Sequence, residues 1–327
     1  GKSIRKAFGR YRVLRQLGQG AMGAVYLAQD SKLDRPVALK IPKFNDQNDP
    51  ELLARFIREA RSAATLSHAH ICPVYDVGEV EGVHYFTMAY IEGYALSSYI
   101  NRAARPPERQ VALLIRKLAL ALEHAHESGV VHRDLKPSNI MIDKRNDPIV
   151  MDFGLARQIE AGADRLTQTG MILGTPAYMS PEQVRAEWDK VGPQSDIYSL
   201  GVILYEMLTG DVPFSGSVGT VIGQILTRAP VPPRDICPEL DPDLESICLS
   251  MMAKDAEHRF RSMADVARAI QAYLHGKTPK LPASAIEEPA SDESTNHGVP
   301  REASASRDES TVATAKSRKV KQQTAKA

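Results

Sequence analysis

The chain has 327 residues, of which 43% are hydrophobic, 25% charged and 6% aromatic. Its 41 Lys and Arg residues nearly balance 40 Asp and Glu residues, and the formal net charge of +1 argues against nucleic-acid binding through bulk charge. Three cysteines without a C-x-x-C pair exclude a disulfide scaffold, and no apolar run reaches membrane-spanning length, so we expect a soluble protein of a reducing compartment.

The first third of the chain is predicted to be mainly β-structure. Short alternating or apolar runs predict strands at 11–17, 24–29, 36–41, 74–78 and 84–90. One helix is expected among them, because Asp49 can cap a helix and Pro50 suits its first position. Its apolar residues keep a helical spacing to about Leu66.

The middle of the chain is predicted to be mainly helical. Helical spacing of apolar residues predicts helices at 108–128, 195–208, 218–227, 243–252 and 263–274. Residues 276–327 contain no Phe, Trp or Tyr and are rich in Ala, Ser, Thr, Glu and Pro, so they are predicted to be a disordered tail. We therefore expect a basic arm over 1–10, a folded region over 11–275 and a tail over 276–327.

Three glycines lie between the first two predicted strands. Residues 18–25 read G-Q-G-A-M-G-A-V, with Gly18, Gly20 and Gly23 in a G-x-G-x-x-G-x-V pattern. Glycines let the backbone approach phosphate oxygens and donate N–H groups to them. A dinucleotide fingerprint would place such glycines at the start of a helix, whereas here strand-like runs lie on both sides. A hairpin over phosphates is favoured, with a glycine-rich turn without ligand as the alternative.

Charged residues follow two further apolar runs. Lys40 ends the run V-A-L-K and requires an anionic partner if it is buried, either phosphate or Glu59 of the predicted helix. The stretch 132–139, H-R-D-L-K-P-S-N, places an Asp, a Lys and an Asn within six residues, and Asp152 follows the strand-like run 149–151. These residues would supply a carboxylate that orients a hydroxyl and an amine that neutralises phosphate. They would also supply two oxygen ligands for a metal.

Taken together in chain order, these motifs resemble the signature of the protein kinase family: Gly-rich loop, V-A-[IL]-K, H-R-D-L-K-x-x-N and D-F-G. The region 174–182 resembles the family's A-P-E segment with Ser180 in place of Ala, and 196–201 resembles its D-x-[WY]-S-x-G helix. The closest resemblance is to bacterial Ser/Thr kinases of the eukaryotic-like (Hanks) type. It implies an α+β bilobal kinase fold, with a small antiparallel N-lobe over about 11–88, a hinge over 89–93 and a mostly helical C-lobe over 94–275.

The resemblance implies roles for individual residues. Asp134 would act as the base, Lys136 would neutralise the γ-phosphate, and Lys40, held by Glu59, would bind the α- and β-phosphates of ATP. Asn139 and Asp152 would hold Mg²⁺, with Mn²⁺ as an alternative. The residues implied in ATP binding besides Lys40 are Leu17, Gly18, Gly20, Gly23, Val25, Ala38, Met88, Ala89, Tyr90, Met141 and Met151.

Further residues are implied in regulation and structure. Arg133 beside Asp134 is typical of kinases whose activation loop is ordered by a phosphate, and Thr167 and Thr169 are the expected autophosphorylation sites. Thr175 would contact the protein substrate. The resemblance gives structural roles to Phe153, Asp196 and the pair of Glu182 with Arg259.

The resemblance also implies partners and location. We expect a Ser/Thr protein kinase that phosphorylates proteins, with a catalytically dead pseudokinase and a small-molecule phosphotransferase as alternatives. A homodimer through the N-lobe is expected by analogy with bacterial relatives, and no nucleic-acid partner is expected. The chain is expected to be cytoplasmic, either free or as the cytoplasmic part of a kinase anchored in the membrane through sequence beyond residue 327.

Overall fold

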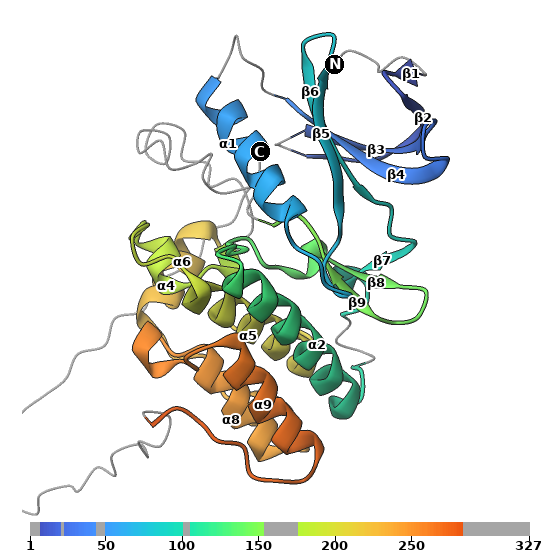
Figure 1. Ribbon diagram of the computed structural model, residues 1–327. Helices are drawn as coiled ribbons and strands as arrows, with labels where there is room; N and C mark the ends of the chain where they lie inside the picture. Colours follow the sequence, from blue (N-terminus) through green and yellow to red (C-terminus); the bar gives the residue numbers. More distant parts are fainter. Residues whose placement is uncertain (1–6, 21–22, 44–49, 101–104, 154–175, 284–327) are drawn as a thin grey trace, which may run out of the picture. The chain divides into compact units, whose positions relative to one another are not determined.

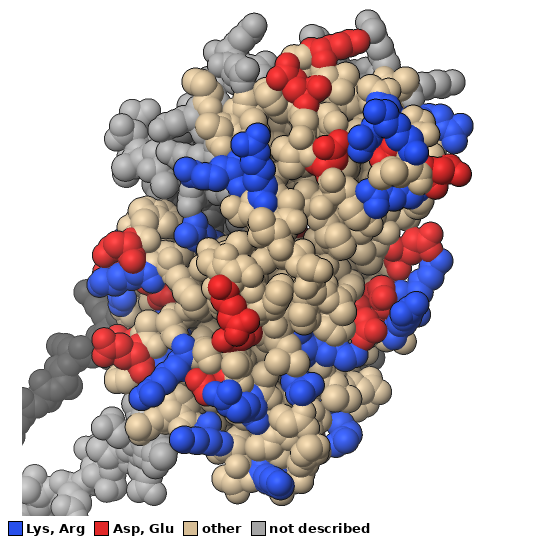
Figure 2. All heavy atoms as spheres, viewed as in Figure 1, with Lys and Arg blue, Asp and Glu red and all other residues tan. Residues whose placement is uncertain are grey.

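The computed structural model describes residues 7–20, 23–43, 50–100, 105–153 and 176–283 (Figure 1). The chain divides into two units, residues 1–286 and 287–327, and every described residue belongs to the first. Acidic and basic side chains are interspersed over the face shown in Figure 2, as the balanced composition predicts. Among the described residues, no helix is long and apolar enough to cross a membrane.

A six-stranded antiparallel sheet forms the smaller lobe, with strand order β1-β2-β3-β4-β6-β5. The central strand β4 is buried from Val37 to Ile41, which explains its nearly continuous apolar sequence. The strands are β1 (Ala7–Phe8), β2 (Tyr11–Gly20), β3 (Gly23–Asp30), β4 (Arg35–Pro42), β5 (Val74–Val80) and β6 (Val83–Ala89).

Helix α1 (Pro50–Ala64) packs against this sheet through its apolar face (Figure 1). Leu53, Phe56 and Ala60 follow one another at helical spacing and are buried against Phe86 and Met88 of β6. The helix begins at the predicted proline and ends two residues before the predicted Leu66. Its packing fixes the position of the helix on which Glu59 lies.

A second, three-stranded antiparallel sheet lies between the smaller lobe and the helices, with the order β7-β8-β9. Its strands are β7 (Gly93–Ala95), β8 (Ile140–Asp143) and β9 (Pro148–Val150). The segment after α1 is tied to β9, because Cys72 N donates to Val150 O at 2.9 Å and Val150 N donates to His70 O at 2.8 Å. The backbone of the smaller lobe is thus joined directly to the sheet that leads into Asp152.

The larger lobe is built around helix α5, which is buried along almost its whole length and packs against α2 and α8. Helix α2 also packs along α9 (Figure 1). The described helices of the larger lobe are α2 (Glu108–Glu127), α4 (Pro181–Val184), α5 (Pro193–Thr209), α6 (Val218–Thr227), α7 (Pro233–Ile236), α8 (Pro242–Met251) and α9 (Met263–Leu274). Short 3₁₀ turns are η1 (Leu96–Ser98), η2 (Pro137–Asn139), η3 (Pro176–Tyr178) and η4 (Ala256–His258).

The predicted arrangement of a small β-rich lobe and a larger helical lobe is confirmed. Strands β1, β7 and β8 were not predicted, because two to four residues are too few to show a period of two. Residues 276–283 are also described, and among them Pro279 is buried and Leu281 is partly buried against the helical core. Composition did not indicate these contacts, because the two side chains lie in a polar stretch.

Candidate active site

Asp134 lies in the loop between α2 and β8, and its carboxylate is held by two neighbours. Lys136 Nζ donates to Asp134 Oδ2 at 2.7 Å, and Asn139 Nδ2 donates to the same oxygen at 3.1 Å. Asn139 Nδ2 also donates to the backbone oxygen of Asp134 at 2.8 Å. Among the described residues Oδ1 has no partner, so this half-buried carboxylate can accept a hydrogen bond from a hydroxyl group.

Lys40 reaches from β4 to the second acidic residue of the site, Asp152. Its Nζ lies 2.7 Å from Asp152 Oδ1, and the lysine residue is only 8% exposed. A buried ammonium requires such a partner, because leaving the charge alone in the interior costs several kcal/mol. The expected partner Glu59 lies on α1, but its side chain is outside the described residues.

The two predicted metal ligands are neighbours through the backbone. Met151 N, adjacent to Asp152, donates to Asn139 O at 2.8 Å. In the described part of the chain, Asp152 Oδ2 and Asn139 Oδ1 accept no hydrogen bond, and such hard oxygens fit Mg²⁺. The described residues contain no cluster of three His, Cys, Asp or Glu suited to a metal. The donor set therefore fits an ion that takes its remaining ligands from phosphates and water.

A buried carboxylate from α5 supports the loop that carries Asp134. Asp196 accepts from the backbone N–H groups of His132 and Arg133, both at 2.8 Å, and lies 2.8 Å from His126 Nε2. Burial alone would raise the pKa of Asp196, but the hydrogen bonds and charges of His126 and His132 outweigh burial and lower the pKa. Arg133 has a left-handed φ of 63°, and the hydrogen bonds from Asp196 to the two N–H groups, which we call the Asp196 clamp, help to hold this conformation.

His132 connects this loop to the segment that carries Asp152. Its Nε2 lies 2.9 Å from Met151 O, and its ring centroid lies 4.9 Å from that of Phe153. Asp152 itself has a left-handed φ of 53°. The side chain of His132 is therefore engaged in positioning the Asp152 backbone, and sequence alone offered no partner for it.

Glu182 and Arg259 form a buried ion pair beneath the site. The guanidinium donates to both carboxylate oxygens at 2.9 Å, with the two side chains 6% and 0% exposed. Ser195 Oγ adds a hydrogen bond of 2.7 Å to Glu182. Gln183, next to Glu182, donates to Arg133 O at 2.8 Å, so the pair also secures the loop around Asp134. Sequence reasoning did not identify Ser195 or Gln183, which carry no distinctive motif of their own.

Apolar residues from both lobes meet in one cluster beside Lys40. All six predicted adenine neighbours belong to it, and so does Ala89. The six residues are Leu17, Val25, Ala38, Met88, Met141 and Met151. Tyr90 lies outside this cluster, and its hydroxyl accepts from Arg15 Nη2 at 3.2 Å. Cys72, which was not predicted, is buried in the cluster, and nothing in its sequence neighbourhood distinguishes it from a core cysteine.

The glycine pattern forms part of the β2–β3 hairpin, as predicted, and no helix follows it. Gly23 is required by the fold, because its φ is +152° and a Cβ there would lie 2.1 Å from Ile41 O. At Gly18 and Gly20 a Cβ would meet no described atom within 4 Å. The fold of the described chain therefore gives no reason for glycine at these two positions, whereas close approach of a ligand to the backbone would.

Three predicted regulatory residues, Thr167, Thr169 and Thr175, lie outside the described residues. Arg133, the expected partner of phosphate on Thr167 and Thr169, is half-buried, and its Nε is a buried donor without a partner among the described atoms. A buried unpaired guanidinium N–H beside Asp134 is suited to an incoming anion.

Comparisons with known proteins agree with this geometry. The family model described as Protein kinase domain matches residues 11–270. Serine/threonine-protein kinase PknB of Mycobacterium tuberculosis is 38% identical over 278 residues, which cover 84% of this chain and 44% of that protein. PrkC of Bacillus subtilis is 39% identical over 264 residues, or 80% of this chain and 40% of that protein. The chain thus spans less than half the length of these curated relatives.

A solved structure shows the same likeness. The crystal structure of the Mycobacterium tuberculosis PknI kinase domain superposes with a TM-score of 0.65 at 28% sequence identity. The match covers 82% of this chain and 98% of that chain. The predicted bilobal fold, with a small antiparallel sheet and a helical lobe, is confirmed by this likeness.

Proposed function

The chain belongs to the protein kinase family, and from this premise we propose that it transfers the γ-phosphoryl group of ATP to Ser and Thr hydroxyls of proteins. The observation that carries the proposal is the arrangement around Asp134: one carboxylate oxygen is fixed by Lys136 and Asn139 and the other is open. Phosphoryl transfer depends mainly on positioning and charge neutralisation, and these residues supply both.

In this proposal each charged group has one task. Asp134 accepts the hydrogen bond of the substrate hydroxyl and takes its proton, while Lys136 neutralises charge on the γ-phosphate. Lys40 binds the α- and β-phosphates, and its ion pair with Asp152 is then either broken or kept alongside the phosphate contact. The family uses ATP and a divalent metal, and Asn139 with Asp152 would hold Mg²⁺ or Mn²⁺, which neutralises phosphate charge when bound.

Proteins are the favoured substrates because the relatives at 38–39% identity are named serine/threonine-protein kinases. A pseudokinase is disfavoured, since the sequence lacks none of Lys40, Asp134, Asn139 and Asp152. A small-molecule phosphotransferase is the remaining alternative, and a substrate panel separates it from the proposal.

The test is a phosphotransfer assay with Mg²⁺-ATP that compares a basic protein with small alcohols and aminoglycosides. Incorporation into Ser and Thr of the protein is expected, and it should be lost in Lys40→Met and Asp152→Asn. Lys43→Met, at an exposed lysine just after β4, is the matched control and should retain activity. Equal incorporation by the parent and both site variants would refute the assignment.

The glycines offer a prediction about ATP affinity. Gly18→Ala should raise the KM for ATP about tenfold, because a Cβ there would keep a phosphate oxygen from approaching the backbone N–H. Losing one such hydrogen bond to a charged oxygen costs about 1.5 kcal/mol. The melting temperature should not change, since the added Cβ meets no described atom. Gly223→Ala, at a similarly open position in α6, should leave the KM unchanged. A drop in melting temperature for Gly18→Ala with unchanged KM would contradict this role.

Regulation by autophosphorylation forms part of the proposal. Thr167 and Thr169 are proposed acceptors, with Arg133 binding the resulting phosphate through its unpaired donor. Phosphosite mapping in the same assay should find phosphate on these threonines. Full activity and unchanged phosphate content after both are replaced by Ala would rule out this mechanism.

We also propose a homodimer through the small lobe. Among the described residues of this lobe, four large apolar side chains are exposed: Leu14, Leu33, Tyr75 and Val83. Leu33, in the turn between β3 and β4, is the most exposed of them at 58%. Leu33→Glu should shift sedimentation from dimer to monomer, whereas Val231→Glu, at a similarly exposed residue of the larger lobe, should not. Monomeric parent protein at micromolar concentration would contradict the proposal.

A membrane-associated location is proposed for the whole protein. Its support is the basic sequence Lys316, Arg318, Lys319, Lys321 and Lys326, since such residues are attracted to anionic lipid at the cytoplasmic face. Fractionation of cells that express the whole protein tests this, and recovery only in the soluble fraction would contradict it.

A further inference from the structure

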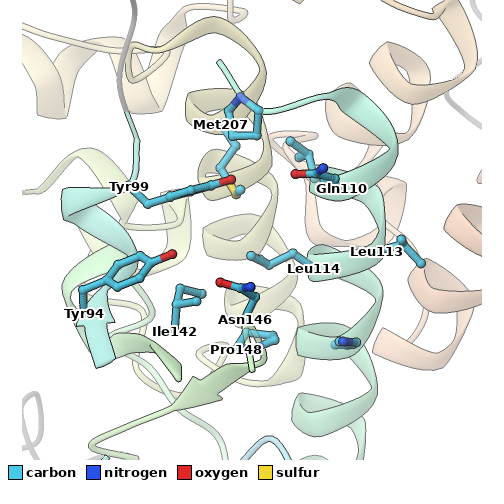
Figure 3. Close-up of a pocket in the computed structure, with 12 residues that line it drawn as sticks. Tyr94, Tyr99, Gln110, Leu113, Leu114, Ile142, Asn146, Pro148 and Met207 are labelled. Carbon is cyan, nitrogen blue, oxygen red and sulfur yellow. The ribbon is translucent and has the colours of Figure 1, made fainter. Parts of the chain in front are cut away.

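A groove on the larger lobe shares no residue with the candidate active site. It has a volume of about 400 Å³ and lies between β7 with η1 on one side and α2 on the other (Figure 3). We name it the tyrosine groove and define it by Tyr94, Tyr99, Gln110, Leu114, Asn146 and Met207. Its volume lies within the range of sites that bind ligands in proteins.

The groove has an apolar floor and open walls. Leu114 of α2, Ile142 of β8 and Met207 of α5 contribute apolar side chains to it. Tyr94 and Tyr99 form one wall, with ring centroids 6.1 Å apart, and face Gln110 and Leu114 across the groove in Figure 3. The two tyrosines are 39% and 36% exposed, so the groove is open along its length rather than closed around a small ligand.

Apart from Lys117, which lines the groove and pairs with Asp147, the polar side chains of the groove are uncharged. The hydroxyls of Tyr94 and Tyr99 and the carboxamides of Gln110 and Asn146 make no hydrogen bond to any described residue. A carboxamide carries a donor and an acceptor in one plane, which matches the donor and acceptor of a peptide bond. Such groups above an apolar floor suit a main chain that lays one apolar side chain into the groove.

Two exposed leucines of α2 extend the surface beyond the groove, with Arg116 and Lys117 between them along the helix. Leu113 lines the groove and is 42% exposed, and Leu120, two turns later on the same face, is 37% exposed. Seven residues of helix span about 10 Å, a length that an extended peptide covers with about three residues. The surface from the groove to Leu120 is therefore longer than one small molecule needs, and it has the dimensions of a short extended segment.

The charge beside these leucines is positive. Arg109, Arg116 and Lys117 lie on α2 next to the groove, whereas the sole acid between residues 108 and 120, Glu108, accepts hydrogen bonds from Asp241 N and Tyr273. Lys117 pairs with Asp147, and Arg109 Nη1 donates to the backbone oxygen of Leu274 at 3.0 Å. Among the described residues neither Arg109 nor Arg116 forms an ion pair with a carboxylate. Figure 2 shows basic side chains over the part of the surface where α2 begins. An acidic segment is thus the complementary one.

We propose that the tyrosine groove docks an extended peptide segment of a partner protein, with an apolar anchor side chain and acidic residues beside it. Gln110 and Asn146 hold the main chain, the floor takes the anchor, and Arg109 and Arg116 attract the acidic residues. This binding requires neither ATP nor phosphate transfer, so it can be tested independently of the proposed catalytic activity.

The test uses two fluorescent peptide libraries with a central leucine, one with flanking glutamates and one with flanking lysines. Binding to the whole chain is measured by fluorescence polarisation without nucleotide. Glutamate-flanked peptides should bind more tightly, and Tyr99→Ala and Gln110→Ala should each weaken binding about fivefold or more. Trp188→Ala, at an equally exposed aromatic residue between α4 and α5, is the matched control and should bind as the parent does.

Melting temperatures establish that the groove variants are folded. Arg116→Gln should reduce the preference for glutamate over lysine without abolishing binding. The proposal is overturned if neither library binds, if lysine-flanked peptides bind equally well, or if Tyr99→Ala and Gln110→Ala bind like the parent. It is also overturned if small aromatic fragments occupy the groove while peptides do not.

Discussion

Asp134→Asn is expected to lower kcat for protein phosphorylation about 10³-fold, within the range that general base catalysis contributes. The amide can accept hydrogen bonds from Lys136 and Asn139, so the loop should keep its shape. What it loses is the charge that orients the substrate hydroxyl and takes its proton. Steady-state rates at saturating ATP and protein substrate measure this effect.

Two controls separate chemistry from folding in that experiment. Asp189→Asn, at an exposed residue between α4 and α5, should retain parent activity. The KM for ATP should change little in Asp134→Asn, because Asp134 is proposed to act on the hydroxyl and not on the nucleotide. A variant with parent kcat would show that another group takes the proton, and loss of thermal stability would indicate a structural role instead.

Arg259→Ala is expected to destabilise the protein by about 3–5 kcal/mol, the usual cost of leaving one member of a buried ion pair alone. The guanidinium also donates to the backbone oxygens of Ala253, Gln194 and Lys254, which would lose their partner as well. Urea denaturation measures the change. Arg261→Ala, at an exposed arginine two residues later, should stay within about 0.5 kcal/mol of the parent.

The same pair predicts an acid limit to stability. Burial alone would raise the pKa of Glu182, but the hydrogen bonds and charge of Arg259 and the Ser195 hydroxyl outweigh burial and lower its pKa to about 2 from the ordinary 4.5. The resulting stabilisation is present above pH 4.5 and is lost as the pH falls from 4.5 towards 2. In Glu182→Gln this part of the pH dependence should disappear from urea titrations. An unchanged acid profile would contradict the assignment.

Local patterns predicted most of the fold. The proline at the start of α1, the apolar run of β4 and the spacing of α2, α5, α6, α8 and α9 all carried their own signal, because each element buries enough residues to show a period. Strands such as β7 could not be predicted, since they exist only through pairing with distant residues. The site residues were recognised from motifs, and their roles remain proposals.

The contacts between those motifs were not readable from the sequence. Lys40 and Asp152 are 112 residues apart, and Asp196 binds backbone groups that lie 63 and 64 residues before it. The left-handed backbone at Arg133 and Asp152 has no local cause, because neither residue type favours it strongly enough. Such conformations depend on partners that the completed fold supplies.

The clamp of Asp196 on the backbone of His132 and Arg133 has a consequence for biosynthesis. During translation the motif residues up to Asp152 emerge from the ribosome before the carboxylate that shapes their loop, and Glu182 emerges long before Arg259. A growing chain therefore contains the charged residues of the site, up to Asp152, before Asp196 and Arg259 are available to hold them in position. We therefore expect the proposed phosphoryl transfer to require the last helices of the larger lobe, and a chain that ends before them to be inactive.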